Sequence, residues 1–281
     1  MAEELFKESR LLKIELGKLK VTVPGKTFLK ICMIKYFIGS FFLLFLLASC
    51  KKENANFTSE SINDYFPLQV GNYITYDLDS TVYYLNFGEK AVNIHYQAQY
   101  RVDSQLSDNS GRPAYNISRY LRSDSSQPWQ IDNVFTAVPT GKSIEYIEDN
   151  NRFIKLMMPV KEGFSWKGNS YLSSYAYSMY SSSNNDFITA WDYTYDSIGV
   201  PLIINSIKID STIKVFEVDE KVGDPASQPN GYADRTYSVE KYGKGIGLIY
   251  RECLHWEYQP PSSQSPGYIG FGIKMSIIDH N

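Results

Sequence analysis

Four side chains with acid–base or metal-binding chemistry alternate along one stretch near the end of the sequence: Arg251, Cys253, His255 and Glu257. Successive residues of a β-strand point to opposite faces, so these four share one face if the stretch is extended. A histidine beside a carboxylate can act as a general base or hold a metal ion. The alternative is a polar outer face with charge pairs to a neighbouring strand, and we favour it because charged side chains are seldom buried.

Other candidates for catalysis or metal binding have simpler explanations. His95 and His280 lie far from His255 in the sequence, and no spacing typical of a zinc site is present. The acidic turns 108–111 and 148–151 lack the calcium-loop pattern, and Asx residues favour turns for their own reasons. We therefore predict no catalytic residue, no metal site and no cofactor.

An aromatic row offers the best candidate for recognition. Trp191, Tyr193 and Tyr195 alternate and would share one strand face. Such a row can stack on sugar rings or line an apolar cleft, although a row of this kind is more often part of a hydrophobic core. Both interpretations stay open, and these three are our candidate ligand-stacking residues.

Strict alternation of apolar and polar residues indicates the elements that carry these side chains. Between Val92 and Val102 the even positions are apolar and the odd ones, including His95, are polar. This period is typical of an antiparallel strand with one face in a core, so the even residues should point inward and His95 outward. The expected strands are 72–85, 92–102, 114–121, 143–148, 152–157, 187–198, 207–218, 235–242, 248–258 and 268–278.

These strands, joined by hairpins, predict an all-β fold with a single antiparallel domain. A sandwich and a strongly curved, barrel-like sheet both fit this pattern. Turn residues at 86–90, 108–111 and 149–151 mark expected connections, and 60–65 could form a short helix.

A short apolar run near the N-terminus indicates export. The run from Tyr36 to Leu47 has twelve residues, follows Met33 and Lys35, and ends before Cys50. A membrane-spanning helix needs roughly 20 apolar residues, whereas a secretory signal peptide needs roughly 7–15.

The segment Leu47-Ala48-Ser49-Cys50 resembles the lipobox of bacterial lipoproteins. The resemblance implies cleavage before Cys50 and attachment of acyl chains such as palmitate to that cysteine. It therefore implies a lipid-anchored protein, with the membrane as its partner through Cys50. In some lipoproteins an aspartate after the cysteine retains the protein at the inner membrane. Lys51 stands there, so we expect the outer membrane, without a prediction of which face.

These features divide the chain into four parts. Residues 1–32 are interpreted as a start site placed too early, or else as an N-terminal extension, and 33–49 as the signal peptide. Residues 50–64 form the lipidated cysteine and a flexible polar tether, because they offer few apolar side chains for a core. Residues 65–281 form the β domain.

The composition limits the range of partners. Residues 50–281 carry 20 basic and 27 acidic side chains, a net charge of −7. This balance argues against nucleic acid as a ligand. Cys253 is the one cysteine left after Cys50 is used, so no disulfide is expected within the exported chain.

Two further blocks resemble those of uncharacterised exported bacterial lipoproteins. Phe66-Pro-Leu-Gln-Val-Gly-Asn-Tyr73 resembles their F-P-L-x-x-G opening, and Gly243-Lys-Gly-Ile-Gly-Leu-Ile-Tyr-Arg-Glu252 resembles a glycine-rich block near their ends. That group has no assigned chemistry. The sequence thus predicts an envelope lipoprotein that binds a glycan, another ligand or a partner protein and is not an enzyme. The alternative is a lipid-anchored hydrolase or glycan-processing enzyme without a recognisable motif.

Overall fold

Twelve antiparallel strands of one sheet dominate the structure. The computed structural model describes residues 60–83, 91–173, 188–263 and 266–281, all within one unit, Thr58–Asn281. The strands are β1 (Tyr73–Tyr83), β2 (Val92–Ser107), β3 (Pro113–Arg122), β4 (Gln130–Pro139), β5 (Ser143–Glu148), β6 (Asn151–Met157), β7 (Ser165–Trp166), β8 (Tyr193–Ile204), β9 (Ile207–Val222), β10 (Ala233–Gly243), β11 (Gly247–Gln259) and β12 (Gly267–His280). Two 3₁₀ turns, η2 (Ile62–Asp64) and η4 (Ile188–Ala190), accompany them.

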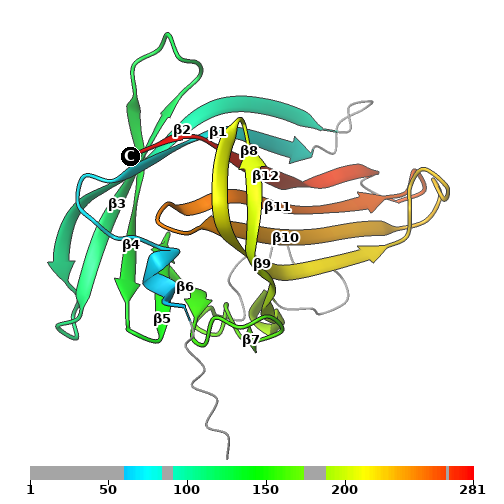
Figure 1. The fold of residues 1–281 in the computed structure, drawn as a ribbon. Coiled ribbons are helices and arrows are strands. Elements are labelled where there is room, and N and C mark those ends of the chain that lie inside the picture. The colour runs from blue at the N-terminus through cyan, green and yellow to red at the C-terminus, as the bar shows by residue number, and fades with distance from the viewer. Residues whose placement is uncertain (1–59, 84–90, 174–187, 264–265) are drawn as a thin grey trace, which may run out of the picture. The chain divides into compact units, whose positions relative to one another are not determined.

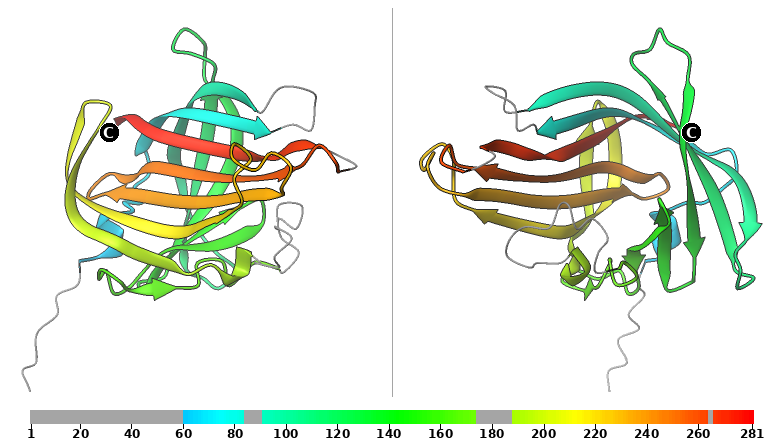
Figure 2. Two further views of the ribbon diagram at one scale, coloured as in Figure 1. Left: turned by 90° about the vertical axis from the view of Figure 1, so that its right-hand side faces the viewer. Right: turned by 180° about the vertical axis from the view of Figure 1, so that it is seen from behind.

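The strand order places the two ends of the folded unit side by side. It runs β6-β5-β4-β3-β2-β1-β12-β11-β10-β9-β8-β7, so each strand pairs with its neighbour in sequence except at one position. There β1 pairs with β12, as the adjacent cyan and red strands show (Figures 1 and 2). The first and last strands therefore lie at the centre of the sheet, and β6 and β7 form its edges.

The sheet curves until these two edges meet. The backbone N–H of Ile154 in β6 donates to the carbonyl of Gly168, just after β7, at 2.7 Å. The Ile154 carbonyl accepts the Trp166 indole N–H at 2.8 Å. Both backbone groups of this edge residue are thus satisfied, which protects an exposed edge from pairing with other chains. The all-β prediction is confirmed, and the sheet is the nearly closed, barrel-like form rather than a sandwich.

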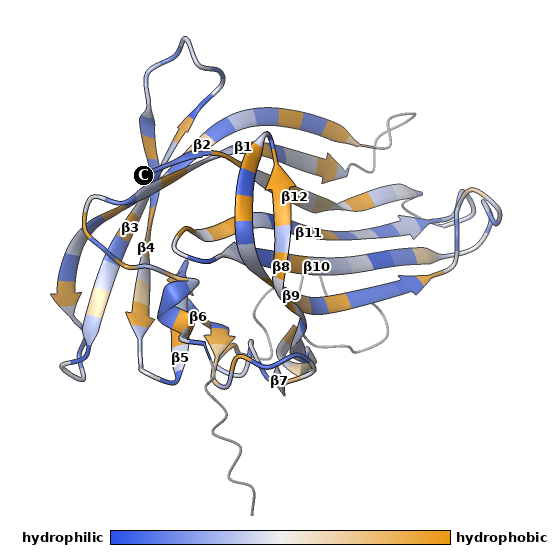
Figure 3. Cartoon of the chain, viewed as in Figure 1, coloured by the Kyte–Doolittle hydropathy of each residue, from blue (hydrophilic) through white to orange (hydrophobic). Residues whose placement is uncertain are grey.

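Hydrophobic and hydrophilic residues alternate along the strands, as the coloured bands show (Figure 3). The buried hydrophobic side chains form three clusters. In β2, Ala98 and Val102 are buried and Tyr96 and Tyr100 pack against the core, as predicted. His95 is exposed and its ring lies 2.9 Å from Asp79. The prediction is wrong at Ile94, which is 41% exposed, because pairing with β3 begins only at Gln97.

Two turns have the conformations that their residues favour. Asp149 and Asn150 both have positive φ, 49° and 63°, which is the two-residue turn whose twist suits a hairpin. The Asp108 carboxylate accepts the backbone N–H groups of Ser110 and Arg112 and the side chain of Arg112. These hydrogen bonds close the turn that was expected at 108–111. The predicted turn at 86–90 lies outside the described residues.

The packed part of the chain begins before the expected boundary at residue 65. Ile62, which the sequence places in the tether, is 1% exposed, and Tyr65 is fully buried. The short helix expected at 60–65 is present as η2. Strands β4 and β7 were not predicted from the sequence. Strand β8 starts at Tyr193, six residues later than expected, because η4 precedes it. No helix among the described residues is long and apolar enough to cross a membrane.

Candidate functional site

A cavity of about 90 Å³ lies between the segment before β1 and the strands β1–β3, β5, β6 and β10–β12. Its wall is largely apolar and aromatic and includes Phe66, Tyr76, Tyr100, Val102, Tyr146 and Met275. A water molecule needs about 10–15 Å³ of such space, so the cavity can hold a small ligand of several non-hydrogen atoms.

The two sequence blocks Phe66–Tyr73 and Gly243–Glu252 meet at this cavity. Phe66, Pro67, Leu68, Asn72 and Tyr73 of the first block line it, as do Ile246, Gly247, Leu248 and Arg251 of the second. Two backbone hydrogen bonds join the first block to Val102. The Gly71 N–H donates to the Val102 carbonyl at 2.8 Å, and the Val102 N–H donates to the Asn72 carbonyl at 2.9 Å. The spacing of the blocks along the chain gives no indication of this meeting, since it depends on the pairing of β1 with β12.

Glycine is required where the second block passes the first. Gly247 has φ +114°, and a Cβ there would lie 3.1 Å from Cδ1 of Ile74. Both the backbone conformation and the close approach disfavour a side chain. The glycine therefore lets β11 begin directly beside the wall of the cavity.

Four charged side chains also line the cavity: Glu148, Lys155, Glu240 and Arg251. Lys155 Nζ donates to Glu240 Oε1 at 2.7 Å, and the Tyr242 hydroxyl donates to Glu240 Oε2 at 2.5 Å. The Arg251 guanidinium lies 3.5 Å from Glu240 and 3.8 Å from Glu148. Lys155 and Glu240 are buried, with 6% and 1% of their side chains exposed.

Burial and mutual attraction set the protonation of this cluster. Desolvation alone would raise the pKa of Glu240, but the positive charges of Lys155 and Arg251 outweigh it and lower that pKa. Burial opposes the charge of Lys155 too, yet the nearby carboxylates raise its pKa. Both members of the Lys155–Glu240 pair are therefore charged at neutral pH.

Glu217 is a third carboxyl near Lys155, at 3.6 Å from its Nζ. Here desolvation dominates and raises the pKa, with the charge of Glu240 acting in the same direction. One Glu217 oxygen accepts the Ser238 hydroxyl at 2.6 Å, and the other makes no hydrogen bond among the described residues. Glu217 does not line the cavity.

Several polar groups of the cavity wall have no hydrogen-bond partner in the described part of the chain. They include the Arg251 guanidinium, the Glu148 carboxylate and the Tyr146 hydroxyl. About a quarter of the Arg251 side chain, 24%, and 21% of Glu148 remain accessible. Since both residues line the cavity, these groups are available to a molecule bound there.

The face of β11 that carries Arg251, Cys253, His255 and Glu257 points inward, contrary to our expectation of an outer face. Arg251 lines the cavity, and His255, which shares its face, is only 6% exposed and lies 2.9 Å from the Thr236 hydroxyl. Burial lowers the pKa of His255. The expectation failed because β10 supplies polar partners directly opposite, with Glu240 beside Arg251 and Thr236 beside His255. Among the described residues no group of three or more histidine, cysteine or acidic side chains could hold a metal ion.

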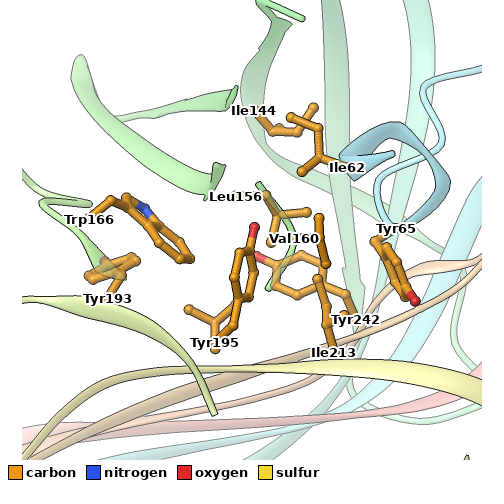
Figure 4. Packing of buried hydrophobic residues seen from close by; sticks show 11 residues of the cluster. Ile62, Tyr65, Ile144, Leu156, Val160, Trp166, Tyr193, Tyr195, Ile213 and Tyr242 are labelled. Carbon is orange, nitrogen blue, oxygen red and sulfur yellow. The ribbon is translucent and has the colours of Figure 1, made fainter. Parts of the chain in front are cut away.

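The structure places the predicted aromatic row in the core. Tyr193 and Tyr195 are 2% and 0% exposed, and Trp191 packs against the same cluster, which Figure 4 shows with Trp166. The Tyr195 hydroxyl donates to the Met157 carbonyl at 2.7 Å and accepts the Met157 N–H at 3.0 Å. Tyr195 thus links β8 to edge strand β6. This position matches the core interpretation and leaves these two tyrosine rings no free face for a sugar.

Comparisons with known proteins give little guidance on function. No family model matches the chain, and no curated protein matches it. One similar solved structure is that of a Bacteroides fragilis protein with a YmcC-like fold, assigned as an exported protein. It is 13% identical, covers 76% of this chain and 99% of its own, and has a TM-score of 0.30.

Proposed function

We propose that this protein is a lipoprotein of the cell envelope, anchored to the outer membrane through Cys50, which binds a small ligand in the cavity of its β unit without chemical turnover. The cavity carries the proposal: it combines an apolar, aromatic wall with a few polar groups that converge on one side. This combination is typical of small-molecule sites.

The arrangement of the charged groups favours binding over catalysis. Both Glu240 oxygens accept strong hydrogen bonds, and Lys155 is held by the same carboxylate. Acid–base catalysis needs a group free to exchange a proton with the substrate. One observation favours the hydrolase alternative, since the pKa values of Glu217 and Glu240 shift in opposite directions, as in paired acids and bases. Glu217 does not line the cavity, however, and we therefore favour an ion-pair role.

Lipid anchoring would keep the β unit near the membrane. Cys50 lies outside the described residues, and the packed chain begins at Ile62. An extended chain spans about 3.5 Å per residue, so the segment between them reaches at most about 40 Å. Two or more acyl chains are needed for stable anchoring, which lipoprotein acylation would supply.

Toluene is a suitable test of the cavity, since it has an apolar ring and no head group. The unit Thr58–Asn281 has its own core, so a chain beginning at Lys51 can be used. We expect saturating toluene to raise the melting temperature by about 2–4 °C, because a ligand that binds only the folded state stabilises it.

Leu68→Trp should abolish this rise, because the larger side chain fills the cavity. Leu106→Trp is the matched control at a position that is 39% exposed and outside the cavity, and it should keep the rise. Equal responses of the wild type and the Leu68 variant would contradict binding in this cavity.

Membrane attachment gives a second prediction. Separation of inner and outer membranes should recover the mature chain with the outer membrane, since Lys51 follows the lipidated cysteine. Protease treatment of intact cells would then show which face it occupies. Recovery solely with the inner membrane, or in the soluble fraction, would contradict the proposed location.

A further inference from the structure

A donor and an acceptor without hydrogen bonds face each other at the polar side of the cavity. Arg251 Nη1 and Glu148 Oε2 are 3.8 Å apart, beyond hydrogen-bonding distance, and neither side chain has another hydrogen-bond partner among the described residues. The adjacent Lys155–Glu240 pair is, in contrast, closed at 2.7 Å. The charged groups of the cavity that are free to bind a ligand are therefore Arg251 and Glu148.

The charges lining the cavity are balanced. Two carboxylates, Glu148 and Glu240, stand against two cations, Lys155 and Arg251. A ligand with a net charge would leave one charge uncompensated in a poorly solvated site, and that is costly. A neutral head group avoids this cost, provided that it satisfies both Arg251 and Glu148.

We propose, building on the proposed function, that the cavity selects neutral carboxamides: ligands with an apolar body and an amide head group. The amide carbonyl accepts from Arg251, and the amide N–H donates to Glu148. An amide holds its acceptor and donor side by side, so both can reach partners 3.8 Å apart through hydrogen bonds of about 2.9 Å. The Tyr146 hydroxyl is a third group available to the head.

The apolar body of the ligand packs against aromatic rings whose orientation is fixed. Tyr100 packs edge-on against Tyr76 at 5.5 Å and stacks on Phe135 at 5.6 Å. Its hydroxyl is engaged by Arg119 at 3.3 Å, which leaves its ring as apolar wall. An aromatic or short aliphatic body of similar size to the cavity suits this surface.

Four compounds that share one ring separate the effect of the head group from that of the body. Titration calorimetry would compare benzamide, benzoate, protonated benzylamine and toluene on the chain beginning at Lys51. We expect benzamide to bind about tenfold or more tighter than toluene, because hydrogen bonds to charged groups are among the stronger ones in proteins. Benzoate and benzylamine should bind more weakly than benzamide.

Glu148→Gln provides the sharpest variant, since it preserves size and removes one negative charge. The cavity then carries a net positive charge, and the order should reverse, with benzoate binding about tenfold tighter than benzamide. Arg251→Met should reduce benzamide binding to the level of toluene while toluene binding persists. Arg101→Met, at an exposed site outside the cavity, should change nothing.

The outcomes distinguish the two proposals. If toluene binds but the head group has no effect, or if Glu148→Gln leaves the order unchanged, the carboxamide proposal is overturned and the binding cavity stands. If none of the four compounds binds, the proposed function itself fails.

Discussion

Methionine in place of Lys155 is expected to lower the free energy of unfolding by about 3–5 kcal/mol at neutral pH. Methionine keeps most of the side-chain volume but removes the positive charge. Glu240 would lose its hydrogen bond at 2.7 Å and Glu217 its ion pair at 3.6 Å, and both carboxylates are buried. Breaking one side of a buried ion pair is costly because the remaining charge is neither hydrated nor compensated. Urea unfolding of the chain beginning at Lys51 would measure the loss.

The loss should shrink as the pH falls. Lys155 lowers the pKa of both Glu217 and Glu240, so its removal lets desolvation raise both. A carboxyl whose pKa is raised on folding does not destabilise the folded protein below its unfolded pKa, near 4.5. The protein loses stability as the pH rises through the pKa that the carboxyl has in the folded state. The difference between variant and wild type should therefore be smaller at about pH 5 than at about pH 7.

Lys214→Met is the matched control. Lys214 and Asp196 form a pair of similar length, 2.8 Å, but 33% and 50% of their side chains are exposed. Exposed pairs contribute about 1 kcal/mol or less, so this variant should be nearly as stable as the wild type. The two lysine variants could lose similar amounts of unfolding free energy, or the loss for Lys155→Met could be independent of pH. Either result would contradict the explanation that the loss comes from buried carboxylates left without a positive charge.

Replacement of Cys50 by alanine is expected to abolish lipid attachment altogether. The thiol is the acceptor for the lipid in the proposed processing, and alanine has no nucleophile at that position. The signal peptide from Met33 to Ser49 should stay attached, because cleavage follows lipidation in lipoproteins of the kind that the segment resembles. Labelling of cells with radioactive palmitate, followed by gel analysis of the precursor and mature forms, measures both effects.

Cys253→Ala serves as the control for this experiment. Cys253 lies on β11 within the folded unit, and burial raises the pKa of its thiol, so it is a poor acceptor. Its variant should retain full labelling and normal cleavage. Label that persists in Cys50→Ala would contradict lipidation at Cys50, and label lost only in Cys253→Ala would place the lipid elsewhere.

Local patterns in the sequence determined the class of fold and many of its strands. The period of two specified that Tyr96, Ala98, Tyr100 and Val102 of β2 face the core, since a strand has only two faces. The pair Asp149-Asn150 specified its hairpin, because both residues tolerate positive φ. These features depend on neighbours in the chain and are therefore visible in the sequence.

Alternation shows which residues share a face but not which face is inside, and the tertiary structure decided that on β11. Arg251 and His255 face inward because Glu240 and Thr236 on β10 lie directly opposite and compensate their burial. The same limit applied to the row from Trp191 to Tyr195, whose alternation fits both a binding surface and a core. Curvature of the sheet brought Tyr195 against Met157 on the opposite edge and made it core.

The cavity also depended on the tertiary structure alone. Phe66 and Arg251 are far apart in the sequence, and they line one cavity because β1 pairs with β12 and the sheet then closes on itself. Pairing between distant strands is fixed by the combined packing of all twelve and not by any local pattern. The sequence could thus specify the strands that carry the polar and aromatic groups, while only the closed sheet placed Glu148, opposite Arg251, where a ligand could join them.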